Sequence, residues 1–329
     1  MQRLDLYGTD KTVDITEPEL LEAIRKVLSG AGPEVRVGVG DDAAVVAPGS
    51  GEIVLTTDVM VEGTHFRGGL TTARDLGVKA MNVSLSDVAA MAASPRYALC
   101  ALTLSDRVDA AWVMELFGGM REACDEHALW LVGGNLTRGS DLTIAITVVG
   151  EVAPGRALLR SGATPGDEIV VTGSLGGAAA GRRLVEGAEH RGLGAAERDA
   201  VHRFMRPTAR IGEAAVLARE GARSMIDVSD GLTLDLSRLC EAGGVGARID
   251  AARLPIHEGA TLEDALGGGE DYEVLATIAD GSNASTEMRR TFGVELSSIG
   301  VMTEARGLVL VDPAGNERTL DPDGWDPFA

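Results

Sequence analysis

APGRALLRSGATPGDE, residues 153–168, is the stretch that divides this chain. It is rich in glycine, proline and small polar residues, which favour turns and interrupt regular structure. Strand-like apolar segments alternate with segments of helical spacing on both sides of it, for example residues 142–152 before it and residues 224–242 after it. The pattern predicts an α/β protein of two mixed-sheet domains, residues 1–152 and residues 153–329.

The composition fits this division and excludes several classes of function. The chain has 329 residues, 45% of them hydrophobic, so it has enough apolar side chains for two cores. Its net charge of −20, without a run of lysine or arginine, argues against a nucleic-acid partner. No apolar stretch approaches the roughly 20 residues that span a bilayer, and the charged N-terminus lacks the apolar core of a signal peptide. The cysteines are few and widely spaced, so we expect reduced thiols and a cytoplasmic protein.

The most informative pattern is a repeated one, in which carboxylates stand beside glycine, serine or threonine at the ends of apolar strands. These carboxylates are Asp41, Asp42, Asp58, Asp87, Asp227, Asp230, Glu270 and Asp271. Any one of them alone is most simply a turn or helix cap. Asp87, however, lies in an otherwise small and apolar helical pattern, where a buried carboxylate is costly unless it is paired or binds a metal. Oxygen ligands without histidine or cysteine clusters indicate Mg²⁺ or Ca²⁺ rather than zinc.

The familiar nucleotide and calcium motifs do not explain these acids. Gly38, Gly40 and Ala43 match a dinucleotide-binding turn, but Asp41 and Asp42 would face the pyrophosphate and no helix follows. No P-loop is present, and residues 227–231 do not match the glycine and glutamate positions of an EF-hand. Phosphoryl transfer to a phosphate acceptor fits better, because the acceptor is already anionic near pH 7. Such a reaction needs several Mg²⁺ ions for charge and alignment, but no catalytic nucleophile and no strong general base.

Eight sequence motifs follow one another along the chain, and their order matches that of a known enzyme family. They are GVGDDAAVV (38–46), TTDVMVEGTHF (56–66), KAMNVSLSDVAAMAASP (79–95), LVGGNLTRG (131–139), GRALLRSGATPGD (155–167), IDVSDGL (226–232), GGEDYEV (268–274) and DGWDPF (323–328). With them the chain resembles the thiamine-monophosphate kinase family, within the superfamily of ATP-using enzymes that includes aminoimidazole ribonucleotide synthetase. The resemblance extends over residues 16–328. It implies direct, in-line transfer from ATP to thiamine monophosphate, giving thiamine diphosphate. It also implies a homodimer in which N-terminal strands of both subunits form a shared barrel.

The resemblance also implies roles for individual residues. The N-terminal domain would bind ATP and Mg²⁺ and dimerise, and the C-terminal domain would complete the active site. The implied metal ligands are Asp42, Asp58, Asp87, Asp227 and Asp230, with oxygens of Thr56, Thr57 and Asn135 and with Asp41 in support. The implied ATP contacts are Gly134, Asn135, Arg160 and Ser229. The implied thiamine-phosphate contacts are His65, Glu270 and Trp325, since a cationic thiazolium ring suits a carboxylate and an aromatic neighbour.

Some alternatives stay open at this point. His65 and Glu270 could instead stabilise turns, Trp325 could anchor the tail, and Arg160 could pair with an acid. The family usually has aspartate where this chain has Asn135, which keeps a carbonyl oxygen but loses a charge, and this predicts weaker Mg²⁺ binding. The chain could also act on another substrate, for instance in cyclising an amidoribonucleotide, or bind nucleotide without turnover. The glycine-rich residues 172–181 could contact phosphate, although we favour a purely structural turn.

Overall fold

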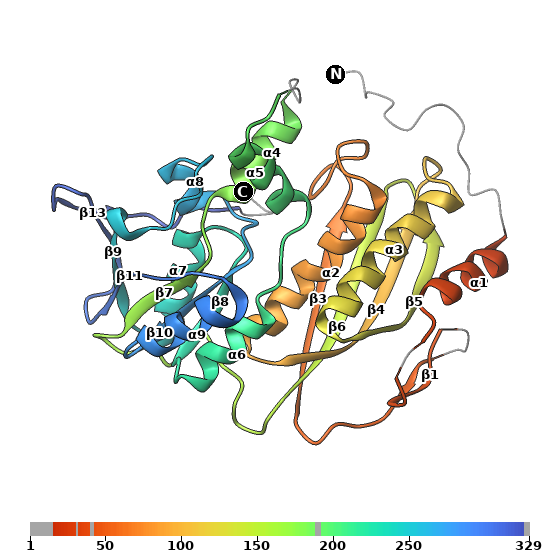
Figure 1. The fold of residues 1–329 in the computed structure, drawn as a ribbon, viewed down its shortest axis with the longest axis horizontal. Helices are drawn as coiled ribbons and strands as arrows, with labels where there is room; N and C mark the ends of the chain where they lie inside the picture. Colours follow the sequence, from red (N-terminus) through yellow and green to blue (C-terminus); the bar gives the residue numbers. More distant parts are fainter. Residues whose placement is uncertain (1–15, 31, 40–42, 188–191, 326–329) are drawn as a thin grey trace. The chain divides into compact units, whose positions relative to one another are not determined.

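The computed structural model describes residues 16–30, 32–39, 43–187 and 192–325 (Figure 1). By its internal packing the chain divides into two units. The N-terminal unit ends at Pro154, and the C-terminal unit begins at Gly155 and also takes in the short segment Ala89–Ala93. Within the described ranges, none of the helices combines the length and hydropathy that a bilayer crossing requires.

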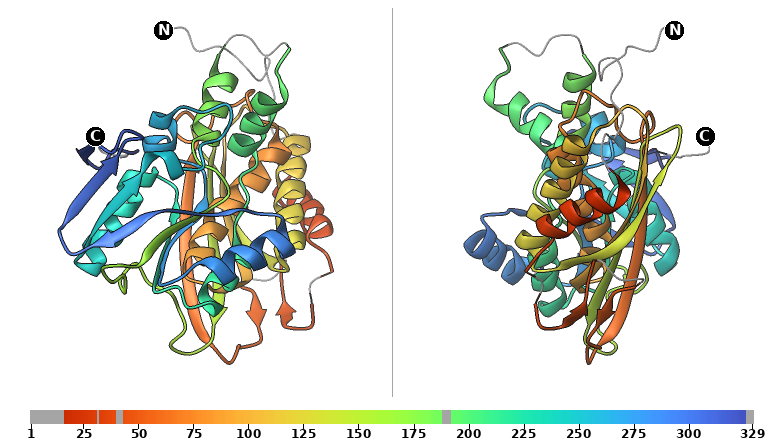
Figure 2. Two further views of the ribbon diagram at one scale, coloured as in Figure 1. Left: turned by 60° about the vertical axis from the view of Figure 1, so that its left-hand side comes forward. Right: turned by 90° about the vertical axis from the view of Figure 1, so that its right-hand side faces the viewer.

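The N-terminal unit is built on a four-stranded sheet covered on one face by two long helices. The elements, in chain order, are α1 (Glu17–Val27), β1 (Val35–Val37), β2 (Val45–Val46), β3 (Glu52–Val61), α2 (Ala73–Ala90), β4 (Ser94–Leu104), α3 (Ala110–His127), β5 (Trp130–Arg138) and β6 (Thr143–Val152). The sheet order is β3-β6-β4-β5, with β4 and β5 parallel and the other pairs antiparallel. In the right-hand view of Figure 2 the sheet is seen nearly edge-on, with α2 and α3 on the same side of it.

The strand β3 carries three of the expected site residues, Thr56, Thr57 and Asp58, and its two faces differ in burial. Its side chains alternate, as a strand requires. Met60 is buried and Asp58 partly buried on the helix-covered face, whereas Leu55 and Val59 are exposed on the other face. The apolar and threonine residues 53–57 alone predict a shorter strand than β3. Its ladder with β6 carries it on to Val61, because every residue from Glu52 to Val61 has a partner in β6.

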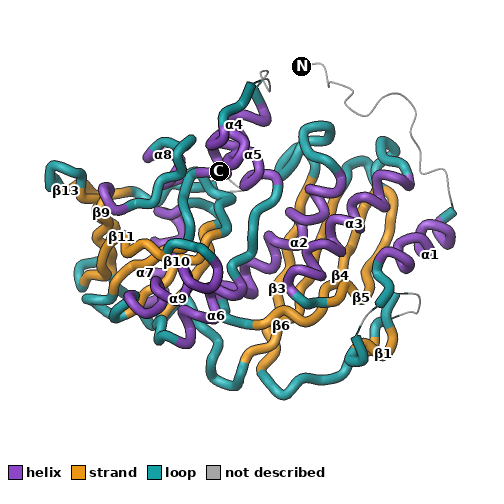
Figure 3. The backbone as a smooth tube through the Cα atoms, viewed as in Figure 1, coloured by secondary structure: helices purple, strands orange, loops and turns teal. Residues whose placement is uncertain are grey.

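The C-terminal unit contains a larger sheet with helices on both faces (Figure 3). Its elements are β7 (Glu168–Thr172), α4 (Gly177–Glu186), α5 (Ala195–Met205), α6 (Ile211–Arg219), β8 (Ser224–Val228), α7 (Leu232–Gly243), β9 (Gly246–Asp250), the short 3₁₀ helix η1 (Ala251–Arg253), α8 (Leu262–Gly267), β10 (Glu273–Ile278), α9 (Ser282–Phe292), β11 (Leu296–Thr303), β12 (Gly307–Val311) and β13 (Glu317–Leu320). The sheet order is β13-β12-β9-β11-β7-β10-β8, with only the β12–β9 pair parallel among the described strands.

The strand β10 explains why this sheet needs helices on both faces. Leu275 packs into a core with α7 and α8, while Val274 and Ala276 pack into a second core with α6 and α9. All six residues of β10 are buried, so the strand is apolar on both sides and shows no polar alternation. The expectation of two mixed-sheet α/β domains is therefore confirmed, while the intersubunit barrel remains a prediction.

Candidate functional site

Asp58 and Asp87 form an acidic pair on the helix-covered face of the N-terminal sheet. Asp58 projects from β3, and Asp87 comes from α2, where it accepts a hydrogen bond of 2.5 Å from the Thr56 hydroxyl. Burial, and next the negative charge of Asp87, raise the pKa of Asp58 to about 6, while a hydrogen bond from Ser84 opposes the rise. Burial and the charge of Asp87 both disfavour a second negative charge here unless a cation shares the site.

One carboxylate oxygen of this pair is a candidate metal ligand. The Oδ2 atom of Asp58 is buried and accepts no hydrogen bond within the structure described here. A buried carboxylate oxygen of this kind costs free energy unless a cation occupies its lone pairs, so the residues fit a hard divalent ion such as Mg²⁺. No cluster of three or more ligating side chains is found among the described residues. The expected ligands Asp41 and Asp42 lie outside those residues.

Thr57 lies on the other side of the sheet from this pair. Its hydroxyl donates to the Ile146 carbonyl at 3.2 Å and lies 3.1 Å from the Thr147 hydroxyl. The hydroxyls of Thr56 and Thr57 therefore cannot both face Asp87, because consecutive strand residues point to opposite faces. The structure brings Thr56 to the acidic pair and leaves the Thr57 hydroxyl away from it.

Gly134 and Asn135 line a cavity of about 1230 Å³ within the N-terminal unit. The cavity is bordered by α1, by the segment from Ala43 to Gly49 and by strands β4 and β5. Gly134 has φ +156°, and a Cβ atom there would lie 1.8 Å from the Cys100 carbonyl oxygen. Only glycine fits this close approach of β5 to β4. Asn135 is exposed, so its amide faces accessible space.

His65 lies in the turn that follows β3. Its Nδ1 atom accepts a hydrogen bond from the Val61 amide at 3.1 Å, which helps to close the turn. The interpretation of His65 as a turn-stabilising residue therefore has direct support from this contact. Its expected role toward the substrate stays a prediction.

The turn after β8 is organised by a residue that we did not predict, Asp235. One oxygen of Asp235 accepts from the amides of Ser229, Asp230 and Gly231 at 3.1, 3.0 and 3.2 Å. Burial raises the pKa of Asp235 to about 6, and backbone hydrogen bonds oppose the rise. Arg238 then bridges the two acids, at 2.5 Å from Asp230 and 2.7 Å from Asp235. The i, i+3 spacing of Asp235 and Arg238 on one helix was the available signal for this pair.

Several expected site residues of the C-terminal unit meet at this turn. Asp227 is buried within β8, opposite Val274, two residues before the turn. The amide of Glu270 donates to the Ser229 carbonyl at 2.7 Å, and the amide of Trp325 donates to the Asp230 carbonyl at 3.0 Å. Three expected roles, for metal, ATP and substrate, thus converge on one short stretch of backbone.

Arg160 is not brought to that turn. The carbonyl of the preceding Leu159 accepts from the Met225 amide at 3.0 Å, near the start of β8, whereas Ser229 follows the end of the strand. Arg160 is exposed and has no ion-pair partner among the described residues. Its expected contact with ATP remains a prediction.

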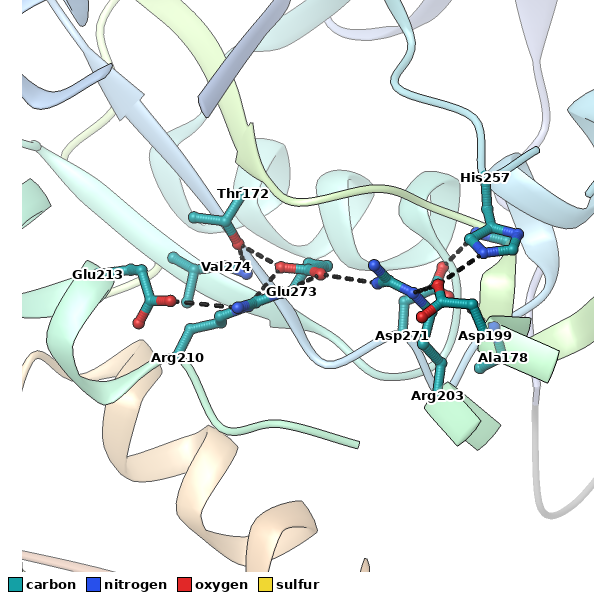
Figure 4. Close-up of polar contacts among 11 residues, drawn as sticks. Thr172, Ala178, Asp199, Arg203, Arg210, Glu213, His257, Asp271, Glu273 and Val274 are labelled. Atoms are coloured by element: carbon teal, nitrogen blue, oxygen red, sulfur yellow. Dashed lines mark hydrogen bonds and ion pairs between the residues drawn. The ribbon is translucent and has the colours of Figure 1, made fainter. Parts of the chain in front are cut away.

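The glycine-rich turn before α4 binds a carboxylate of the protein itself. The amides of Gly176 and Ala178 donate to the Asp271 carboxylate at 2.6 and 3.1 Å (Figure 4). Burial raises the pKa of Asp271 to about 7, and these two hydrogen bonds limit the rise. The N-terminus of α4 is thus already occupied by an anion, which favours a structural role for residues 172–181.

A buried ionic network centres on Glu273, two residues after Asp271 (Figure 4). Glu273 is 1% exposed and accepts two hydrogen bonds of 2.7 Å from Arg210. Arg203 lies 3.4 Å from the same carboxylate and donates to Asp199, which also contacts His257 at 2.9 Å. Sequence reasoning gave these residues no role, because the pairs that join Glu273 to its partners are more than 60 residues apart.

Comparison with known proteins agrees with this architecture. The family model "AIR synthase related protein, N-terminal domain" matches residues 40–152, and its C-terminal counterpart matches residues 164–313. The chain is thus a two-domain protein of the AIR synthase-related class. A curated thiamine-monophosphate kinase of Escherichia coli K12 is 39% identical over 310 residues, which are 90% of this chain and 93% of that protein.

Solved structures lead to the same family. The thiamine-monophosphate kinase of Stenotrophomonas maltophilia K279a is similar with a TM-score of 0.81 and 32% identity, over 94% of this chain and 98% of that one. AaThiL complexed with AMPPCP and TMP is similar with a TM-score of 0.75 and 31% identity, over 100% and 99% of the two chains. The chain belongs to the thiamine-monophosphate kinase family, and the resemblance drawn from its motifs is confirmed.

Proposed function

We propose that this protein transfers a phosphoryl group from ATP to thiamine monophosphate, forming ADP and thiamine diphosphate. The observation that carries the proposal is the similarity over the whole chain to AaThiL, whose structure holds an ATP analogue together with TMP. The E. coli relative, at 39% identity over nearly its full length, bears the name of the same activity. The acidic pair and the turn after β8 are chemically suited to it.

Each domain supplies part of the chemistry. In residues 1–152, Asp58 and Asp87 would hold Mg²⁺, with Asp42 as the expected third carboxylate, and Gly134 and Asn135 would contact ATP. Bound Mg²⁺ supplies charge neutralisation between the two polyanionic substrates and aligns them. Because the acceptor is already an anionic phosphate, no side chain has to remove a proton from it.

In residues 153–329, Asp227 in β8 and Asp230 in the turn after it would be further ligands, and Ser229 would contact ATP. Arg238 now neutralises Asp230, so metal binding at Asp230 would require this ion pair to open or to be shared. Glu270 and Trp325 are tied by their amides to the same turn, and there a carboxylate and an aromatic ring suit a cationic thiazolium. We retain Arg160 as a candidate phosphate contact because it is exposed and cationic.

We also propose that the protein is a homodimer that joins through the uncovered face of the N-terminal sheet. Ile53 and Leu55 are 57% and 68% exposed there, and Val59 and Leu99 are exposed as well. Large apolar side chains gathered on one strand face usually mark an interaction surface, and a second copy of this sheet would bury them. Sedimentation of the wild type and of Leu55→Glu tests this. A monomeric wild type contradicts the dimer.

The activity itself is tested by incubating the purified protein with ATP, thiamine monophosphate and MgCl₂ and separating the thiamine phosphates by chromatography. We expect thiamine diphosphate and ADP in equal amounts, and neither product when EDTA replaces Mg²⁺. Thiamine serves as the control acceptor, because its hydroxyl lacks the phosphate that the proposed reaction requires. ADP released without thiamine diphosphate, or no turnover despite bound ATP, contradicts the proposal.

A further inference from the structure

The four residues from Gly269 to Tyr272, which we call the GEDY segment, have an unusual backbone. Gly269, Glu270 and Tyr272 have φ values of +66°, +60° and +50°. The left-handed region is open to glycine but costs roughly 1–3 kcal/mol for a residue with a side chain, and it persists only where the surroundings enforce it. Glu270, the expected substrate contact, is thus held in a conformation that it would not adopt by itself.

The GEDY segment is fixed from two sides. On one side, the amides of Glu270 and Tyr272 donate to the carbonyls of Ser229 and Val228 at 2.7 and 2.8 Å. On the other side, the Asp271 carboxylate is a side-chain anchor, which accepts from the Gly176 and Ala178 amides. These two donors belong to the first turn of α4, so Asp271 ties the segment to a rigid helix.

We propose that Asp271 is a positioning residue that aims the Glu270 carboxylate at the thiamine part of the substrate. The inference rests on the proposed function. Without the Asp271 anchor, the segment loses its tie to α4, and Glu270 can relax to negative φ, which turns its side chain in another direction. Asp271 itself faces Arg203 and Glu273, whose opposite charges also act on it, so it is bound within the C-terminal unit and does not itself face substrate.

Removing the Asp271 anchor should weaken the binding of thiamine monophosphate more than the binding of ATP. Asp271→Asn keeps the shape of the side chain but places an amide donor against a backbone N–H. We expect the KM for thiamine monophosphate to rise roughly ten- to a hundredfold, the range that corresponds to one hydrogen bond to a charged group. The KM for ATP should change less than about threefold, because Ser229 keeps its own anchor at Asp235.

A double-mutant comparison separates positioning from a general structural role. The variants are Asp271→Asn, Glu270→Gln and the two together, with Asp280→Asn as matched control. Asp280 likewise accepts from a backbone amide, that of Ser282, near the start of α9. If Asp271 acts through Glu270, the double variant has the same KM for thiamine monophosphate as Glu270→Gln alone. The control should leave both KM values unchanged.

Three results would overturn the inference: independent, additive effects of the two substitutions, an equal rise in both KM values, or no change in Asp271→Asn. If Asp271→Asn does not fold by circular dichroism, Asp271→Ser is measured instead. Failure of both variants to fold, while the control folds, also overturns it, because Asp271 would then be required for the fold itself. A wild type that forms no thiamine diphosphate contradicts the proposed function, whereas an active wild type with an unaffected Asp271→Asn contradicts only this inference.

Discussion

Replacing Asp58 with asparagine should stabilise the metal-free protein and weaken its response to Mg²⁺. In the folded protein, burial and the charge of Asp87 raise the pKa of Asp58 from 3.8 to about 6. A carboxyl group with a raised pKa favours the folded state at pH values below its pKa in the unfolded chain. This contribution is lost as the pH rises through its pKa in the folded protein. At pH 8 the ionised Asp58 therefore disfavours the folded state.

The two pKa values set the size of the effect. A difference of about 2 between the folded and unfolded pKa values of Asp58 destabilises the folded protein by roughly 3 kcal/mol at pH 8. At pH 5 the same two pKa values give about half of that destabilisation. Asparagine removes the charge and keeps the shape of the side chain. We therefore expect Asp58→Asn to raise the free energy of unfolding by about 1–3 kcal/mol at pH 8 in EDTA, and by less at pH 5.

Urea unfolding in EDTA and in MgCl₂, at both pH values, measures this directly. Mg²⁺ should stabilise the wild type, because a bound cation relieves the repulsion between Asp58 and Asp87, but it should stabilise Asp58→Asn much less. Asp141→Asn is the matched control, since Asp141 is an exposed acid of the same unit. The reasoning is refuted if Asp58→Asn is less stable than the wild type at pH 8 in EDTA, or if Mg²⁺ stabilises both proteins equally.

Three further predictions concern the buried network, β5 and Asn135. Glu273→Gln removes one of the two buried carboxylates that pair with Arg210, the other being Glu213, so denaturant unfolding should show a loss of about 3 kcal/mol, and a loss below about 1 kcal/mol would contradict the pairing. Gly134→Ala places a Cβ against the Cys100 carbonyl, so it should unfold the N-terminal unit or lower its melting temperature sharply, as calorimetry would show. Asn135→Asp restores a charge and should lower the Mg²⁺ concentration for half-maximal turnover, and an unchanged Mg²⁺ dependence would exclude a role of Asn135 at a metal.

The sequence was informative where a local pattern and the tertiary environment agree. Residues 142–152 alternate strictly in burial, in line with strand β6. The apolar spacing of residues 109–128 predicts a helix, and α3 forms from Ala110 to His127 with Asp109 as its N-cap. The same rule of alternation places the hydroxyls of Thr56 and Thr57 on opposite faces of β3, while the expected roles of their oxygens at a metal stay a prediction. The motif resemblance named both residues together, because a family pattern records which residues occur and not which way each points.

Contacts between distant segments could not be predicted in this way. Asp271 meets Gly176 across 95 residues of sequence, and no spacing rule connects them. Asp235 lies close to its partners in the chain but resembled an ordinary charged residue on a helix, since its role depends on the direction of three backbone amides. Such directions are set by the turn geometry after β8, which appears only when the strand is packed in its sheet.

The hydrogen-bond partners of the carboxylate oxygens distinguish structural carboxylates from candidate metal ligands better than the sequence motifs do. Asp235 and Asp271 accept from backbone amides and Glu273 from two arginines, so a cation would have to displace existing hydrogen bonds. Asp58 has a buried oxygen without such a donor, and Asp230 is held by the partly exposed guanidinium of Arg238. A metal ion therefore gains most at Asp58 and must compete with Arg238 at Asp230. By this argument the acidic pair in the N-terminal unit should bind Mg²⁺ before any nucleotide is present, whereas Asp230 should bind it only when phosphate groups draw Arg238 away.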